Sequence, residues 1–151
     1  MKKIAITILT TCILFSVLHA QIQDPVKWSY SAVKKSGKEY TVTISATLAP
    51  DWHIYSMNTP NGGPVATTFN FKRNPLVVID GKTTEAGKLN TMHDDIFGVD
   101  VKYYSETVTF TQPVKLKSAV KTNLSGTIKY MVCNDKMCLP PKTVPFNIQI
   151  Q

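Results

Sequence analysis

Cysteine is scarce in this chain of 151 residues, which contains only Cys12, Cys133 and Cys138. The last two form the spacing C-x4-C, which differs from the C-x-x-C of thioredoxin-like proteins. There is no second cysteine pair that could complete a four-sulfur zinc site. Cys12 lies in the apolar N-terminal segment described next, so any cysteine chemistry of the folded domain rests on Cys133 and Cys138.

Long hydrophobic runs are missing after the first twenty residues. Those residues combine the charged Lys2 and Lys3, an apolar segment from Ile4 to Leu18, and a small residue, Ala20. This pattern is typical of a secretory signal peptide, and the apolar segment is short for a permanent membrane span. We expect residues 1–20 to be cleaved, leaving one exported domain, residues 21–151, with no membrane span of its own. Export also places the remaining cysteine pair where disulfides persist.

Acidic residues are outnumbered, but the basic ones form no run longer than two. Without the two lysines of the leader, the formal charge falls from +7 to +5. Lysines scattered along strand-like segments indicate a solvated polar surface. Together with export, this excludes nucleic acid as an expected partner.

Sustained helical periodicity is absent, and nine prolines and seven glycines interrupt the chain. Apolar and polar residues instead alternate with a period of two, which predicts half-buried strands. The clearest cover 39–48, 107–116, 124–132 and 144–150, and shorter ones cover 26–33, 53–57, 67–71, 76–79 and 101–104. Pro113 predicts an edge or a bulge in its strand. Seven to nine short strands predict an all-β fold, a sandwich of two antiparallel sheets.

A hydrolase constellation is also missing. No serine nucleophile or separated pair of carboxylates is visible, and Asp94-Asp95 is read as a solvated loop. Trp28 and Trp52 are expected in core or edge packing. His53 and His93 are expected at the surface or in local hydrogen bonds.

The pair itself lies in VCNDKMCLPP, residues 132–141, between two predicted strands. If Tyr130 and Val132 face the core, Cys133 points outward on the opposite face. Two residues at the mouth of a hairpin can reach the separation of about 5.5 Å between Cα atoms that a disulfide prefers. A bridge closing so short a loop stabilises by only about 2 kcal/mol. A structural staple, a redox-active pair and a metal clip all remain open on this reasoning.

A family resemblance favours the redox interpretation. The stretch YMVCNDKMCLPPKTVPF, residues 130–146, resembles the active-site hairpin of the N-terminal periplasmic domain of DsbD, the thiol:disulfide interchange protein. DWHIYS, residues 51–56, and HDDIFGVDVKYY, residues 93–104, are similar to two further segments of that domain, the second being an acidic-aromatic loop. The resemblance covers essentially the whole of residues 21–151.

The resemblance implies an immunoglobulin-like antiparallel β-sandwich that relays reducing equivalents in the periplasm, without a cofactor or metal. Thiol–disulfide oxidoreductase activity is the favoured interpretation, with a thioredoxin-like or membrane electron-donor protein and exported disulfide-containing clients as partners. By position, Cys138 matches the sulfur that forms the mixed disulfide, and Cys133 the resolving one. Phe97 matches the shielding aromatic residue. The polar neighbours of the cysteine pair in that family correspond by position to Asp94, Asp95 and Tyr55.

The match departs from the family pattern in places. The four residues between the cysteines are one fewer than in the best-known members. The loop before Gly98 is also one residue shorter, so either Ile96 or Phe97 is expected to cover the pair. His53 stands where those members have an aromatic residue. Because the chain ends at Gln151, directly after the last predicted strand, we expect a stand-alone domain whose electron donor is another polypeptide.

Charges near the pair oppose one another. Asp135, with Asp94 or Asp95, would disfavour a thiolate, whereas Lys129 and Lys136 would favour it.

Two alternative functions from another class, that of binding proteins, remain. One is a Cu(I) site, since thiolates and thioethers suit that ion; its candidate ligands are Met92, His93, Met131, Cys133, Met137 and Cys138. The other is an adhesion or binding sandwich with an inert disulfide.

Overall fold

The computed structural model describes residues 24–95 and 97–150, and this part of the chain consists of β-strands without helices. The signal peptide predicted for residues 1–20 lies outside the described residues. The strands are β1 Val26–Ser36, β2 Glu39–Leu48, β3 His53–Tyr55, β4 Thr68–Phe71, β5 Val77–Ile79, β6 Thr84–Asp94, β7 Val99–Leu116, β8 Thr122–Tyr130, β9 Val132–Cys133 and β10 Lys142–Ile150. Within residues 24–95 and 97–150, no helix is long and apolar enough to cross a membrane.

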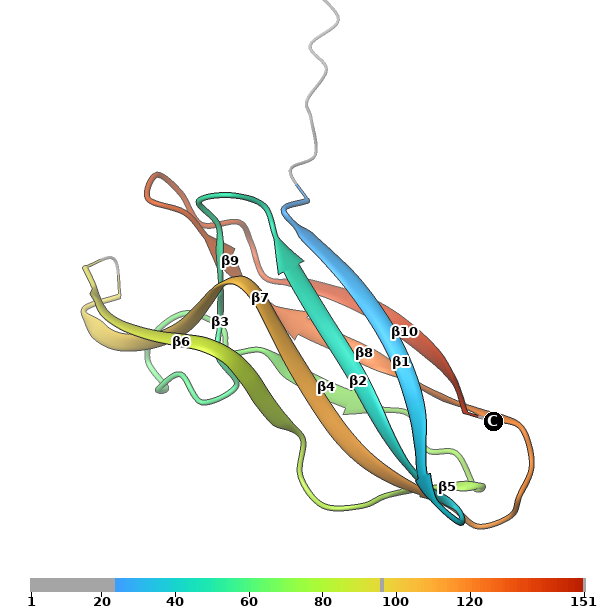
Figure 1. The fold of residues 1–151 in the computed structure, drawn as a ribbon. Coiled ribbons are helices and arrows are strands. Elements are labelled where there is room, and N and C mark those ends of the chain that lie inside the picture. The colour runs from blue at the N-terminus through green and yellow to red at the C-terminus, as the bar shows by residue number, and fades with distance from the viewer. Residues whose placement is uncertain (1–23, 96, 151) are drawn as a thin grey trace, which may run out of the picture.

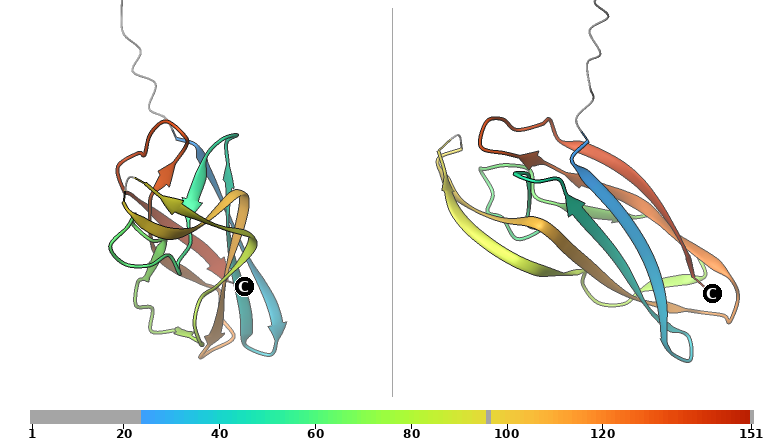
Figure 2. Two further views of the ribbon diagram at one scale, coloured as in Figure 1. Left: turned by 90° about the vertical axis from the view of Figure 1, so that its left-hand side faces the viewer. Right: turned by 45° about the horizontal axis from the view of Figure 1, so that its top comes forward.

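The strands form two antiparallel sheets, so the predicted all-β, immunoglobulin-like sandwich is confirmed (Figure 1). The larger sheet has the order β1-β2-β7-β3-β9, and β5 and β6 pair with the other side of β7. The smaller sheet has the order β10-β8-β4. The loop between β9 and β10 and the tip of the β6–β7 hairpin lie at the same end of the molecule, opposite the end of β10 (Figures 1 and 2).

The core lies between the sheets and follows the period-two pattern of the sequence. On β2 the alternate residues Tyr40, Val42, Ile44, Ala46 and Leu48 are all buried. Equivalent stripes on β8 and β10 face them from the smaller sheet. Burying alternate apolar residues on both sheets is the main stabilising contribution to such a fold.

One glycine allows two strands and a ring to approach closely. A Cβ atom added to Gly126 on β8 would lie 2.4 Å from the backbone oxygen of Asn70 on β4 and 2.5 Å from the Phe146 ring. Any side chain here would push β4 or β10 away from β8. Gly126 is therefore required by packing.

Strand β7 is longer than the sequence pattern predicts, because it joins two segments that were expected to be separate. A bulge at residues 105–107 connects them, and there Glu106 has a positive φ of 65°. Pro113 lies between the parts of β7 that pair with β5 and with β6. The neighbouring Gln112 side chain fills this gap by donating to the carbonyl oxygens of Asp80 and Pro113. The edge expected at Pro113 is thus a local one, inside a central strand.

Strand β6 was not predicted at all. Most of its residues are exposed, so the apolar alternation that marks a half-buried strand is missing. It pairs with β7 from Thr84 opposite Thr111 to Asp94 opposite Val99. The segment expected to be a loop before the 101–104 strand is therefore the tip of a long hairpin.

The chain changes sheet at Met131. Strand β8, which ends at Tyr130, belongs to the smaller sheet, whereas β9 pairs with β3 in the larger sheet. This crossing carries Cys133 to the end of the sandwich, beside β3.

Candidate functional site

Cys133 and Cys138 are joined by a disulfide bond at the base of a short loop. Their Cα atoms lie 4.0 Å apart, and the two residues pair as an isolated antiparallel bridge. The Asn134 backbone N–H donates to the Met137 carbonyl oxygen at 2.9 Å, and Asn134 Oδ1 accepts from the backbone N–H groups of Lys136 and Met137. Hydrogen bonds therefore close this loop in addition to the disulfide.

The two cysteines differ in exposure. Cys133 is only 2% exposed, whereas Cys138 is partly exposed and follows Met137, which is 47% exposed. A molecule approaching from solvent reaches Cys138 more easily than Cys133.

Burial of Cys133 follows from the register of β3. This strand pairs His53 with Cys133 and Ile54 with Val132. Because successive side chains leave opposite faces of a sheet, His53, Tyr55 and Cys133 share the outer face, and Ile54 and Val132 face the main core. The prediction that Cys133 lies opposite the main stripe is confirmed. The prediction that it points outward is wrong, because a second hydrophobic cluster, which includes Tyr55, buries it.

The Tyr55 hydroxyl connects the disulfide to the β6–β7 hairpin. This side chain is fully buried, and its oxygen lies 3.1 Å from Cys133 Sγ and 3.1 Å from Asp94 Oδ2. The His53 Nε2 atom lies 3.4 Å from the same oxygen. A single hydroxyl therefore bridges a sulfur, a carboxylate and an imidazole.

Asp94 holds the hairpin tip together. Its side chain is 4% exposed, and its Oδ1 atom accepts from the Phe97 backbone N–H at 3.3 Å. Its carbonyl oxygen accepts from the Gly98 N–H at 2.7 Å, and Gly98 has a positive φ of 66° that favours glycine. The hairpin tip is thus tied through Asp94 and Tyr55 to Cys133.

Burial shifts two of these groups. It raises the pKa of Tyr55 far above the ordinary tyrosine value, and the adjacent Asp94 carboxylate adds to the shift, so the hydroxyl keeps its proton. Burial also lowers the pKa of His53, an effect that Asp94 and Asp135 partly offset. His53 is therefore largely neutral at neutral pH.

The family described as "Thiol:disulfide interchange protein DsbD, N-terminal" matches residues 20–149. The chain belongs to this family. Curated proteins gave no match.

Three solved structures share the fold of this DsbD N-terminal domain. The N-terminal periplasmic domain of ScsB from Proteus mirabilis is 22% identical with a TM-score of 0.60, and the match covers 86% of this chain and 48% of that one. The Neisseria meningitidis DsbD N-terminal domain in the reduced form is 19% identical with a TM-score of 0.56, covering 84% and 89%. A complex of the DsbD and PilB N-terminal domains from the same organism matches at 13% identity and a TM-score of 0.52, covering 84% and 87%. The chain thus spans about half the length of the ScsB structure.

The structure of this DsbD N-terminal domain brings together some of the residues expected at its site and separates others. Tyr55 and Asp94 lie at the disulfide, as described above. Phe97 is partly buried in the hairpin tip, and its Cβ atom lies 3.9 Å from where a Cβ of Gly63 would be. Asp95 is exposed. Ile96, the alternative cover, lies outside the described residues.

The charged residues named from the sequence lie at the surface, with the exception of Asp94. Lys129, Asp135 and Lys136 are exposed, and Asp135 faces a groove beside the disulfide. The expected competition of charges is therefore between solvated groups, apart from the buried Asp94.

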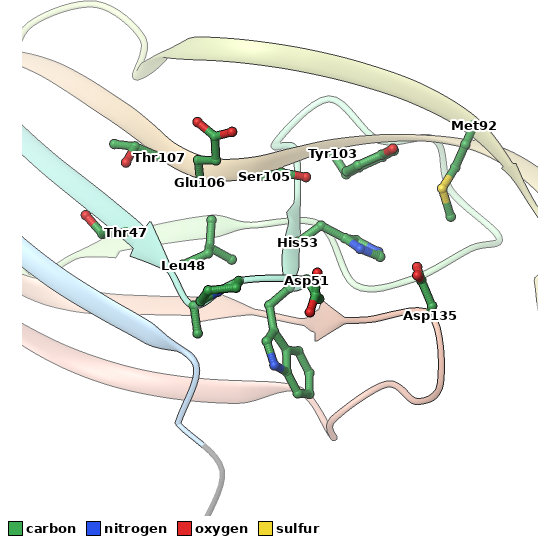
Figure 3. A pocket seen from close by; sticks show the side chains of 13 residues that line it. Thr47, Leu48, Asp51, His53, Met92, Tyr103, Ser105, Glu106, Thr107 and Asp135 are labelled. Carbon is green, nitrogen blue, oxygen red and sulfur yellow. The ribbon is translucent and has the colours of Figure 1, made fainter.

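That groove was not predicted from the sequence. It has a volume of about 610 Å³ and lies between the end of β2, β3 and the bulge of β7 (Figure 3). His53 lies on its wall, with the acidic residues Asp51, Glu106 and Asp135 around it. Only tertiary structure reveals it, because its residues come from four separate parts of the chain.

Glu85 is a second group that was not predicted from the sequence, and it holds the residues next to Tyr55 in place. The Glu85 carboxylate on β6 accepts from the Ser56 hydroxyl, from the Met57 backbone N–H at 2.8 Å and from the Asn58 side chain at 2.7 Å. Burial and Glu85 together raise the pKa of Tyr104 to about 12. Through its hydrogen bonds to Ser56, Met57 and Asn58, Glu85 fixes the residues that follow Tyr55.

The alternative of a Cu(I) site can be compared with where the structure places its candidate ligands. In residues 24–95 and 97–150, no three His, Cys, Asp or Glu side chains lie close enough together to hold a metal ion. Of the residues named for a Cu(I) site, Met131 packs against the cluster around Cys133, whereas His93 is bound to Asp100 at 2.9 Å on the exposed hairpin.

Proposed function

We propose that this DsbD N-terminal domain is an exported, periplasmic electron relay that passes reducing equivalents between proteins through the Cys133–Cys138 pair. The observation that carries the proposal is the asymmetry of the disulfide. One sulfur belongs to a partly exposed residue, and the other is buried against the Tyr55 hydroxyl. Exchange needs an accessible sulfur to attack and a stabilised sulfur to leave.

A purely structural role explains the pair less well. The bond spans a separation of five residues, for which the chain-entropy contribution is only about 2 kcal/mol. The Asn134 side chain and the Leu139–Val132 backbone bond at 3.0 Å already hold the same loop. A domain with a continuous core between two sheets gains little from such a staple.

The exposures support a division of roles. A partner's thiolate attacks Cys138 and forms the mixed disulfide, and Cys133 leaves and later resolves it. The Tyr55 hydroxyl favours a thiolate at Cys133 by donating a hydrogen bond, whereas the buried Asp94 disfavours it. The exchange needs no cofactor.

The hairpin tip acts as a shield in this proposal. Phe97 and the exposed Asp95 lie on the tip that Asp94 and Tyr55 tie to Cys133. Moving the tip strains this chain of hydrogen bonds, so a partner that displaces it gains access to the sulfurs. Small oxidants lack the contact area to do so.

Analogy with a similar domain supports the choice of partners. The neisserial DsbD N-terminal domain, whose structure is similar, forms a complex with the PilB N-terminal domain. By analogy, this chain receives electrons from a thioredoxin-like or membrane-embedded donor protein and delivers them to exported proteins that contain disulfides.

The proposal is tested by trapping the mixed disulfide. The oxidised domain is incubated with a thioredoxin variant that keeps its attacking cysteine and lacks its resolving one. The expected product is a covalent complex in which peptide mass analysis finds the thioredoxin cysteine bound to Cys138. Failure to form any complex, at thioredoxin concentrations that reduce known exchange proteins, would contradict the relay.

Two matched variants test the division of roles. With only Cys138 left, the Cys133→Ala domain is expected to form stable complexes with activated thioredoxin. The Cys138→Ala domain, whose remaining sulfur is buried, is expected to react much more slowly. Equal rates would overturn the roles of the two cysteines and leave the exchange function itself standing.

A further inference from the structure

A continuous chain of polar atoms runs from His53 to the buried sulfur. His53 is the cross-strand partner of Cys133, and Tyr55 leaves the same face of β3 two residues later. The imidazole Nε2 lies 3.4 Å from the Tyr55 oxygen, which lies 3.1 Å from Cys133 Sγ. The His53 and Tyr55 rings meet edge to face, with their centroids 5.3 Å apart.

The other end of this chain meets the solvent-filled groove. His53 is 8% exposed, and it lies on the groove wall between Tyr103 and Asp135 in the view of Figure 3. The Tyr103 ring lies against the imidazole, with centroids 4.7 Å apart. His53 is thus positioned between water in the groove and a hydroxyl that contacts the sulfur.

Opening the disulfide creates a need for a proton at this sulfur. When Cys133 leaves, it does so as a thiolate in a site that is 2% exposed. A buried anion is costly unless it is hydrogen-bonded or neutralised. The nearby Asp94 carboxylate increases that cost.

We propose, on the basis of the exchange function above, that His53 is a positioning residue which supplies through Tyr55 the proton that Cys133 takes up when the disulfide opens. In this step the partner's thiolate attacks Cys138 Sγ, the new S–S bond forms, and the bond to Cys133 breaks with its electron pair on Cys133. As the Tyr55 proton moves to Cys133 Sγ, the Nε2 proton of the His53 imidazolium replaces it on Tyr55 in the same step, so Tyr55 is never left as a phenolate. A proton from bulk solvent then reaches His53 through the groove, so one proton is consumed for each disulfide opened.

The charges around His53 set the pH at which this relay operates. Asp94 from β6 and Asp135 from the disulfide loop favour the imidazolium. Asp51 and Glu106 line the same groove, and the rings of Tyr55 and Tyr103 lie against the imidazole. Burial has the larger effect and lowers the pKa of His53. The imidazolium therefore forms mainly below about pH 6.5, the ordinary value for histidine.

The test is the pH profile of disulfide opening by tris(2-carboxyethyl)phosphine, a small reductant that attacks sulfur and also expels a thiolate. Rates are measured from pH 5 to pH 8 for wild type, His53→Phe, His53→Gln and the control His93→Gln, which alters the exposed histidine on β6. Dividing the wild-type rate by each variant's rate cancels the ionisation of the reagent.

The relay predicts that the ratio of the wild-type rate to the His53→Phe rate rises by about tenfold as the pH falls from 7.5 to 5.5. This effect is smaller than is usual for general acid catalysis, because the proton reaches the sulfur indirectly through Tyr55. The ratio for His53→Gln rises in the same way, because glutamine can donate a hydrogen bond but does not titrate. The ratio for His93→Gln stays near one. A flat ratio for both His53 variants, or an equal rise for His93→Gln, overturns the relay.

A second variant keeps the test decisive if His53→Phe does not fold. Tyr55→Phe interrupts the same chain and is expected to give the same profile, and the double variant with His53→Gln is expected to add nothing further. Fully additive effects would overturn the relay. If the wild-type disulfide resists the phosphine at every pH, the same profile is measured with reduced thioredoxin, and resistance to thioredoxin as well would contradict the exchange function itself.

Discussion

The hydroxyl of Tyr55 lies 3.1 Å from the Sγ atom of Cys133. Tyr55 comes from β3 and Cys133 from β9, which are adjacent strands of the larger sheet. Because the same hydroxyl also donates to Asp94 at the base of the β6–β7 tip, a change at the sulfur alters a hydrogen bond that holds this tip. Three distant parts of the sequence thereby act as one site.

Removing that hydroxyl should weaken the site without disturbing its packing. For Tyr55→Phe, we expect the free energy of unfolding of the oxidised domain to fall by about 1–3 kcal/mol, because the buried Asp94 carboxylate loses a donor. Urea unfolding measures this. Tyr103→Phe, on the neighbouring strand β7, is the control and should change stability by less. A larger loss for the control would show that the Tyr55 bonds are not special.

Shortening Phe97 should expose the pair to small reagents. In Phe97→Ala we expect the reduced pair to be oxidised by hydrogen peroxide several-fold faster, since the partly buried ring lies on the tip tied to Cys133. Alkylation of the remaining thiols followed by mass measurement gives the rate. Unchanged oxidation would remove the shielding role from Phe97.

Glu85 offers a test of how Tyr55 is held. For Glu85→Ala we expect a loss of about 2 kcal/mol in unfolding free energy, because its carboxylate binds three successive residues after Tyr55. Glu39→Ala is the matched control, an exposed glutamate on β2 whose pair with Lys115 at 3.7 Å should contribute about 0–1 kcal/mol. Equal losses for the two variants would contradict the anchoring role.

Stability should depend on pH through His53. Burial lowers its folded-state pKa, so the contribution of the neutral imidazole is complete above about pH 6.5 and is lost as the pH falls through the lowered folded value. We expect the fall in unfolding free energy between pH 7.5 and pH 5 to be smaller in His53→Gln than in wild type. An equal or larger fall in the variant would mean that the folded domain does not disfavour the imidazolium.

The fold could be predicted wherever burial follows a period of two. The stripe on β2 and those on β8 and β10 marked the two sheets correctly. Strand β6 escaped prediction because it lies at a sheet edge with most residues exposed, so no apolar pattern marks it. The bulge at residues 105–107 interrupts the pattern of β7, which therefore looked like two strands.

The site was less accessible from sequence than the fold. The cysteine spacing identified the pair, and the family resemblance pointed to Tyr55 and Asp94. The burial of Cys133 depends on the change of sheet at Met131, and the position of His53 opposite Cys133 depends on β3 lying between β7 and β9. Neither has a local signal, because both arise from pairing between distant segments.

The central claim is tested most directly by the reduction potential of the Cys133–Cys138 pair. The domain is equilibrated in glutathione or dithiothreitol buffers of known potential, its free thiols are alkylated, and the reduced fraction is read by mass. An electron relay predicts a value of roughly −180 to −270 mV, the range of known exchange proteins. A value below about −300 mV would mark a structural disulfide and contradict the relay.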